Sequence, residues 1–247
     1  MKKPLLILLF LPMIGFGQTL IPDANFEQAL INLGYDTGTP DGSVPTASID
    51  TVTNLDVNSQ NIADLTGIED FTALTSLDCN SNQLTILDVS QNTALATLNC
   101  RNNQLTDLHL IHNTALYHLW CSFNPLTSLD LSQNTALHTL KCFGNQLTSL
   151  DVSNNTALTY LICGGNQLTS LDVSNNTALT YLWCNNNLLT SLDVRNGNNT
   201  NFTLFESDNN SSLTCISVDD ADWSATNWPN IDPASSFGIT CSQEAGY

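Results

Sequence analysis

Cysteine is the residue of this 247-residue chain with the most varied chemistry, since thiolates bind metals and paired thiols form disulfides. Six of the eight cysteines recur at intervals of 21 residues: Cys79, Cys100, Cys121, Cys142, Cys163 and Cys184. Equivalent residues of stacked coils lie about 4.8 Å apart with parallel side chains, whereas a disulfide needs β-carbons at about 3.8 Å and converging directions. We therefore expect six buried free thiols that pack as small apolar groups. Cys215 and Cys241 lie outside this period and are the candidates for one disulfide.

A column of carboxylates repeats with the same period and is the candidate for cation binding. It consists of Asp88, Asp130, Asp151, Asp172 and Asp193, with His109 in place of one aspartate. Carboxylates stacked about 5 Å apart repel one another, raise one another's pKa or recruit calcium. The alternative is that adjacent serines, such as Ser149 and Ser153, and water solvate them. Calcium is thus the one cofactor hypothesis that the sequence supports.

Other signs of chemistry are sparse. The four histidines His109, His112, His118 and His138 fall in different columns, so we predict no metal site built from them. The sequence contains no nucleophile elbow, no phosphate-binding glycine loop, no His-Glu-x-x-His and no paired CxxC motif. We therefore predict that the protein is not an enzyme.

A third set of residues varies from coil to coil while the rest of each coil is nearly constant. These outward positions collect aromatic and basic residues: Arg101, His118, Trp120, Phe123, Lys141, Phe143, Tyr160, Ile162, Tyr181 and Trp183. Clustered exposed aromatic side chains supply contact area for proteins or stacking platforms for sugars. The alternative is that neighbouring aromatic rings merely cover each other along a sheet. We predict that these ten residues bind a ligand, with the tryptophans as anchors.

The leucines predict how these columns are positioned. Each unit repeats the frame Leu-x-x-Leu-x-Cys-x-x-Asn, followed by a second half that ends in Leu-Asp-Val or a close variant. In both halves inward residues alternate with outward ones, as in a β-strand, and one such unit cannot bury its own apolar side. The sequence therefore predicts a mainly β solenoid, with two short strands in each coil and two parallel sheets. Two asparagine columns, from Asn82 to Asn187 and from Asn92 to Asn176, are predicted to bond the turns from coil to coil.

Four segments are predicted along the chain. Residues 1–17 are typical of a signal peptide, 18–51 form an N-terminal cap, 52–194 hold one irregular and six regular coils, and 195–247 form a C-terminal cap.

The N-terminal cap is predicted to contain an amphipathic helix that covers the first open edge of the solenoid. Asp23 would begin this helix and Gly34 would end it. Phe26, Leu30 and Leu33 would form its buried stripe.

The net charge limits the partners of the chain. It is −18, from 23 acidic and five basic residues, and therefore repels nucleic acid and anionic membranes. No stretch is typical of a membrane-spanning helix. With a signal peptide at residues 1–17, we expect a protein that is secreted or displayed at the cell surface. The oligomeric state does not follow from the sequence.

The repeats resemble the leucine-rich repeat family, and in particular its 21-residue bacterial variety. The entry coil at Asn61–Ile68 is similar to internalin repeats, and the opening Ile21-Pro22-Asp23-Ala24-Asn25-Phe26 resembles the cap of secreted leucine-rich proteins from Bacteroidetes. The resemblance implies extracellular recognition, most often of proteins. We therefore predict a recognition module for an extracellular protein or glycan. The alternative is a structural or adhesive surface protein that assembles through calcium on the aspartate column.

Overall fold

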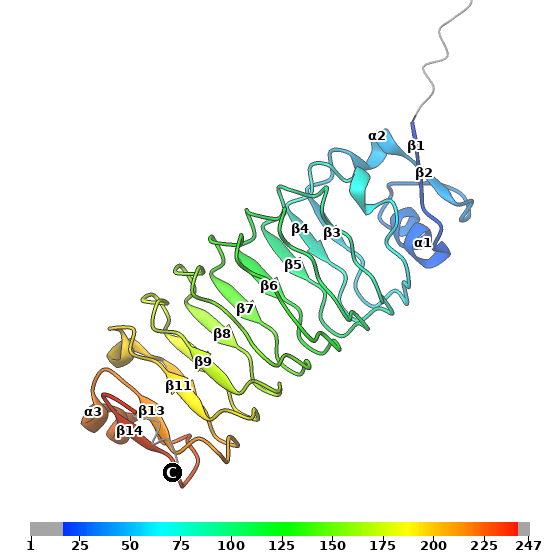
Figure 1. Ribbon diagram of the computed structural model, residues 1–247. Coiled ribbons are helices and arrows are strands. Elements are labelled where there is room, and N and C mark those ends of the chain that lie inside the picture. Colours follow the sequence, from blue (N-terminus) through cyan, green and yellow to red (C-terminus); the bar gives the residue numbers. More distant parts are fainter. Residues whose placement is uncertain (1–16, 242–247) are drawn as a thin grey trace, which may run out of the picture.

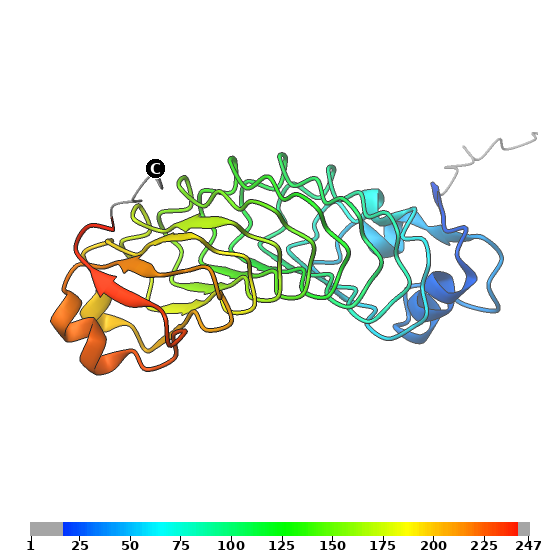
Figure 2. The same cartoon turned by 60° about the horizontal axis from the view of Figure 1, so that its bottom comes forward.

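The computed structural model describes residues 17–241, so the predicted signal peptide lies outside the described residues apart from Gly17. Consecutive coils of the chain stack side by side into an elongated solenoid (Figure 1). Both views place helix α1 (Ala24–Asn32) at one end of the stack and helix α3 (Ala221–Asn227) at the other (Figure 2). The predicted β-solenoid of leucine-rich coils is therefore confirmed.

The first half of the coils contributes to a parallel sheet of eight strands. These strands are β3 (Asn54–Asp56), β4 (Ser76–Asp78), β5 (Thr97–Asn99), β6 (His118–Trp120), β7 (Thr139–Lys141), β8 (Tyr160–Ile162), β10 (Tyr181–Trp183) and β12 (Leu204–Glu206). Neighbours pair in register, so that Leu98 lies beside Leu119 and Leu140 beside Leu161. Because side chains alternate along a strand, the middle residue of each strand faces the core and its two neighbours face outward.

The second half of the coils forms a smaller parallel sheet. It consists of β9 (Ser170–Asp172), β11 (Ser191–Asp193), β13 (Cys215–Ser217) and β14 (Ser236–Gly238). The prediction of a second strand in every coil is wrong for the coils before β9. Their leucines, such as Leu108, are buried without strand pairing. Alternating burial needs only a packed core, whereas a strand also needs backbone bonds such as that from the Val173 N–H to the Asp193 carbonyl.

The inward leucine columns form one continuous apolar core. The six periodic cysteines, from Cys79 to Cys184, lie in this core as buried free thiols, as predicted. Burial raises the pKa of each of these thiols well above its usual range. The thiols are therefore neutral and pack as apolar groups.

We expect the six thiols to resist alkylation in the folded protein, because only an exposed thiolate reacts with iodoacetamide. Mass spectrometry after treatment without reductant should find none of the six modified in the native state and all six modified in denaturant. Modification of native Cys121 or Cys142 would contradict the buried column.

The two asparagine columns join the coils as predicted. The side-chain amide of Asn124 donates hydrogen bonds to the carbonyls of Cys100 and Cys121, at 3.0 and 3.1 Å, and its oxygen accepts one from the Leu105 N–H at 3.1 Å. Asn113 in the second column donates to the carbonyls of the preceding coil. Each buried amide therefore satisfies backbone groups that a turn leaves without partners.

Helix α1 begins at Asp23, as predicted, and that carboxylate also holds the first coil. Its Oδ1 accepts hydrogen bonds from the backbone N–H groups of Asn25 and Phe26, at 2.8 and 3.0 Å. Its Oδ2 accepts hydrogen bonds from the N–H groups of Ala63 and Asp64, at 2.7 and 3.0 Å. One side chain thus caps the helix and fixes it to the solenoid.

The buried stripe of α1 differs from the prediction at one position. Phe26 and Leu30 are buried, but Leu33, the C-cap residue that follows the last helical residue Asn32, is 45% exposed. Ala29 is buried in the stripe instead.

The rest of the cap consists of an antiparallel pair, β1 (Gln18–Leu20) and β2 (Ser43–Pro45), and of the short helix α2 (Thr46–Ile49). The 3₁₀ turn η1 (Ile68–Asp70) follows the first coil.

The stack continues past the predicted end of the repeats at Val194. β12 adds an eighth strand in which Phe205 takes the place of the buried leucine and Ser207 follows the cysteine column. Asn210 continues the first asparagine column, since it donates to the Cys184 carbonyl and accepts from the Leu189 N–H. These substitutions hide one further coil from a search for leucine and cysteine.

The C-terminal end is closed by aromatic packing and one disulfide. Trp228 stacks on Phe205 with ring centroids 4.1 Å apart and also meets Phe237. Cys215 and Cys241 form a disulfide with their α-carbons 5.7 Å apart. The 3₁₀ turn η2 (Asn199–Asn201) and α3 complete this end.

Candidate binding face

The outward residues that follow the buried leucine of each first-sheet strand form one row across the sheet. We call it the outer row: Asp56, Asp78, Asn99, Trp120, Lys141, Ile162, Trp183 and Glu206. Neighbouring members are one strand spacing apart, about 4.8 Å. Arg101, Ser122 and Phe143 lie two residues beyond their row members, in the turns at the carboxyl ends of the strands. The register thus brings residues from several coils to one edge of the sheet.

A hollow of about 350 Å³ lies along this edge, and we call it the aromatic hollow. It is lined by Asn99, Arg101, Trp120, Ser122, Phe123, Lys141, Phe143, Ile162 and Trp183. Seven of the ten predicted ligand-binding residues are in this set. Asn99 and Ser122 are the two that sequence reasoning did not include, because their side chains are small and polar.

Glycines let the phenylalanine rings of the hollow lie close to the backbone of the next coil. A β-carbon at Gly144 would come within 2.9 Å of the Phe123 ring, and one at Gly164 within 3.3 Å of the Phe143 ring. The Phe143 and Trp183 rings meet across the intervening coil, with centroids 5.7 Å apart. A glycine one 21-residue repeat after a phenylalanine, as Gly144 after Phe123 and Gly164 after Phe143, is the signal that could have pointed to this packing from the sequence.

Phe123 holds an unusual backbone conformation. Its φ is +57°, in the left-handed region that favours glycine, and its side chain is 48% exposed. Four of the equivalent turn positions hold Asn102, Gly144, Gly165 and Asn186, residues that adopt this conformation at lower cost, and a fifth holds the small residue Ser81. An exposed aromatic side chain is therefore retained at a place that disfavours it.

Lys141 lies between two aromatic rings at the centre of the outer row. Its Nζ is 5.2 Å from the centroid of the Trp120 ring and 5.3 Å from that of the Tyr160 ring, distances at which a cation is attracted to a π face. Tyr160 in turn stacks on Tyr181 with ring centroids 3.8 Å apart. Burial raises the pKa of Tyr181 to about 12, with the neighbouring Tyr160 adding to the shift. Lys141 therefore contacts a stacked pair of tyrosines on the side opposite Trp120 in the sheet order.

Three of the predicted site residues lie outside the aromatic hollow: His118, Tyr160 and Tyr181. His118 lies at the other end of its strand, where its ring packs edge-on against Tyr117 at 4.7 Å and against His138 at 6.2 Å. Burial lowers the pKa of His118, and the nearby His138 and Lys141 lower it further. His118 is therefore neutral at neutral pH. The Tyr160 and Tyr181 rings stack on each other, so the alternative that neighbouring aromatic rings cover each other along the sheet applies to this pair.

The aspartates of the second half-repeats are bound by local hydrogen bonds. The Oδ1 atoms of Asp88, Asp130 and Asp151 each accept a hydrogen bond at 2.9 Å from the backbone N–H of the serine two residues on. Hydrogen bonds from these serines lower the pKa of all three carboxyl groups, opposite to the increase expected from mutual repulsion. Within residues 17–241, no group of three or more His, Cys, Asp or Glu side chains is arranged to hold a metal ion. The serine alternative therefore describes Asp88, Asp130 and Asp151, whereas Asp193 is bound by Arg195.

These lowered pKa values predict a loss of stability in acid. A carboxyl group whose pKa is lower in the folded than in the unfolded chain stabilises the fold above the ordinary value of 3.8, and this contribution is lost as the pH falls through the folded value. Melting temperature should therefore fall more steeply between pH 6 and pH 3 in the wild type than in an Asp88→Asn, Asp151→Asn variant. Parallel curves for the two proteins would contradict the assignment.

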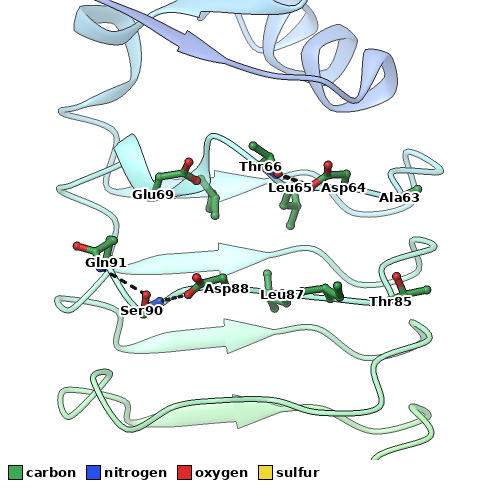
Figure 3. Close-up of a pocket in the computed structure, with 12 residues that line it drawn as sticks. Ala63, Asp64, Leu65, Thr66, Glu69, Thr85, Leu87, Asp88, Ser90 and Gln91 are labelled. Atoms are coloured by element: carbon green, nitrogen blue, oxygen red, sulfur yellow. Dashed lines mark hydrogen bonds between the residues drawn. The ribbon is translucent and has the colours of Figure 1, made fainter.

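A larger hollow of about 570 Å³ lies beside the first coils, on the second half-repeats (Figure 3). Three carboxylates line it, but each is used locally. Asp64 accepts hydrogen bonds from the backbone N–H and hydroxyl of Thr66, Glu69 from the Gly67 N–H, and Asp88 from the Ser90 N–H. Volume alone therefore does not make this hollow a site, and it lacks the convergent aromatic side chains of the aromatic hollow.

Comparison with known proteins identifies the same repeat. The family model "Leucine Rich repeats (2 copies)" matches residues 156–197. Internalin J of Listeria monocytogenes serotype 4b (strain F2365) is 40% identical over 71 residues, which are 29% of this chain and 8% of internalin J.

Two solved structures from Listeria monocytogenes resemble the solenoid. The functional domain of InlJ, described as including a cysteine ladder, is 33% identical with a TM-score of 0.62 over 82% of this chain and 52% of that domain. This chain therefore spans about half of the solved InlJ chain. Internalin C2 is 19% identical with a TM-score of 0.62, over 89% of this chain and 95% of that one, and shows the fold alone. The repeats, the solenoid with its buried column of cysteines and these likenesses together show a leucine-rich repeat solenoid that is similar to the internalins.

Proposed function

We propose that this protein is an exported, non-enzymatic recognition module that binds an extracellular protein through the aromatic hollow. The observation that carries the proposal is the contrast within each coil. The inward leucine, cysteine and asparagine positions are nearly constant, whereas the positions that line the hollow differ from coil to coil and converge as aromatic and basic side chains. Aromatic residues with arginine are the usual anchors of protein interfaces.

Two energetically unfavourable features of the aromatic hollow support this proposal. Phe123 keeps a bulky side chain in a left-handed turn. In the described part of the chain, the buried indole N–H groups of Trp120 and Trp183 have no hydrogen-bond partner. An unpaired buried donor costs about 1–3 kcal/mol. Local departures from the rules of stability are expected where residues are kept for binding.

Export is part of the proposal because residues 1–17 are typical of a signal peptide. The disulfide between Cys215 and Cys241 is of the kind that persists in an oxidising compartment. None of the helices within residues 17–241 has the length and apolar content needed to cross a bilayer. Both secretion and display at the cell surface agree with these features.

The proposal can be tested by probing arrays of extracellular proteins and of glycans with residues 18–247. A Trp120→Ala, Trp183→Ala variant and a Tyr117→Ala variant run beside the wild type, because Tyr117 is an exposed aromatic residue of the same coil outside the hollow. We expect protein hits that the tryptophan variant loses and the Tyr117 variant keeps. Hits that survive in the tryptophan variant, or hits confined to glycans, would overturn the proposal.

Phe123→Gly separates binding from folding. Glycine removes the cost of the left-handed turn, so the free energy of unfolding should rise by about 1 kcal/mol. Loss of the exposed ring should weaken binding of a partner found on the array by at least about tenfold. Urea unfolding and a binding titration measure the two effects. A variant that is less stable and binds as well as the wild type would make Phe123 a structural residue.

A further inference from the structure

Charge changes sign along the outer row. Acidic residues stand at both ends, with Asp56 and Asp78 at one end and Glu206 at the other. The five central members carry no carboxylate and include Lys141. No acidic side chain lines the aromatic hollow, although the chain as a whole has a net charge of −18. The centre of this face is therefore a local exception in an acidic protein.

The basic residues are concentrated at this exception. Residues 17–241 contain three basic side chains other than histidine: Arg101, Lys141 and Arg195. Arg195 forms an ion pair with Asp193 and accounts for the single salt bridge among the described residues. Arg101 and Lys141 both line the aromatic hollow and form no ion pair there. Two uncompensated positive charges thus face the same space.

The spacing of Arg101 and Lys141 suits a single carboxylate bound between them. Arg101 follows β5 and Lys141 is on β7, so two strand spacings, roughly 10 Å, separate their strands. Both are long side chains that can reach an anion seated between them, and an arginine or lysine paired with a carboxylate forms a charge-assisted hydrogen bond. The Phe143 and Trp183 rings, with Ile162, supply an apolar wall in the same hollow.

We propose that the aromatic hollow binds a protein segment in which a single aspartate or glutamate stands next to a large apolar residue. The carboxylate would lie between Arg101 and Lys141, and the apolar side chain would pack on Phe143 and Trp183. Further carboxylates along the segment are disfavoured, because Asp78 and Glu206 repel them at either end of the row. This charge pattern distinguishes an isolated acidic residue from a polyanion.

This inference rests on the proposed function, and its test separates the two. A phage library of random short peptides is panned on the wild type, on an Arg101→Gln, Lys141→Gln variant, on the Trp120→Ala, Trp183→Ala variant, and on an Arg195→Gln control. One enriched peptide is then synthesised with its acidic residue intact and with that residue changed to the matching amide.

We expect peptides with one acidic residue beside an aromatic or large aliphatic residue to be enriched on the wild type and on the Arg195 control. On the Arg101→Gln, Lys141→Gln variant the acidic residue should return to the frequency of the unselected library. Changing acid to amide should weaken binding by about tenfold on the wild type and by less than about threefold on that variant, as a double-mutant cycle requires for a direct charge pair.

Two kinds of result would distinguish a failure of the acidic specificity from a failure of the proposed function. Peptides that need the tryptophans but show no acidic residue, or that show runs of acidic residues, would overturn the acidic specificity and leave the proposed function intact. Peptides that bind the tryptophan variant as well as the wild type would overturn both.

Discussion

Replacing Trp120 and Trp183 together by alanine is expected to weaken binding of the protein partner by at least about 100-fold, or about 3 kcal/mol. Both rings line the aromatic hollow, where Trp120 lies under Lys141 and Trp183 meets Phe143. Truncation removes the apolar wall and also releases the lysine and the phenylalanine from their positions. Because the two rings act on one hollow, the effects of the single variants should not add.

The measurement is a titration of wild type and variant with the same partner, together with a far-ultraviolet circular dichroism melt. Both rings are only half-buried, so the variant should remain folded. Tyr117→Ala serves as the control and should bind within about twofold of the wild type, since surface changes away from the site have small effects. A folded double variant with undiminished affinity would remove the aromatic hollow from the interface.

Replacing Asn124 by alanine is expected to destabilise the fold by about 3–5 kcal/mol. The amide is 3% exposed and makes its bonds across three coils, to the carbonyls of Cys100 and Cys121 and from the Leu105 N–H. Alanine leaves these backbone groups buried and without partners, at about 1–3 kcal/mol for each group. Loss at the middle of a stack also weakens the interfaces between neighbouring coils, on which solenoid stability depends.

Urea unfolding compares this variant with Gln104→Ala, a change at an exposed side chain of the preceding repeat. The control should lie within about 0.5 kcal/mol of the wild type. Asn124→Asp keeps the acceptor for Leu105 but turns an oxygen toward two carbonyls, so it should destabilise the fold as well. An Asn124→Ala variant as stable as the control would contradict the structural role of the column.

Much of the fold could be predicted because the sequence repeats. Buried leucine and cysteine recur at fixed offsets, so the inward faces of Leu98, Leu119 and Leu140 follow from the period alone. The same holds for Asn124 and its equivalents, since a buried amide in a turn has few alternatives to bonding the backbone. The ends of the stack were harder to predict from the sequence. Leu33 keeps the spacing of a buried stripe, but the helix stops one residue before it.

The binding face could be predicted only as a set of columns. The sequence places Trp120, Lys141 and Trp183 at the same outward position of the first strand in three different coils, but which rings share a hollow depends on packing between coils. Phe143 reaches Trp183 because Gly164 leaves room between them, and His118 lies at the opposite end of its strand although it is only two residues from Trp120. Contacts of this kind depend on side-chain volume in neighbouring turns, which a column pattern does not contain.

Recognition through the aromatic hollow is tested most directly by amide hydrogen exchange of the protein with and without a partner found on the array. The account predicts slower exchange, upon binding, in peptides that cover residues 99–101, 120–123, 141–143 and 183–185. Peptides around Asp88, Asp130 and Asp151 should exchange at an unchanged rate. Slower exchange at those aspartates, with none at the hollow, would place the interface on the second half-repeats and contradict the account.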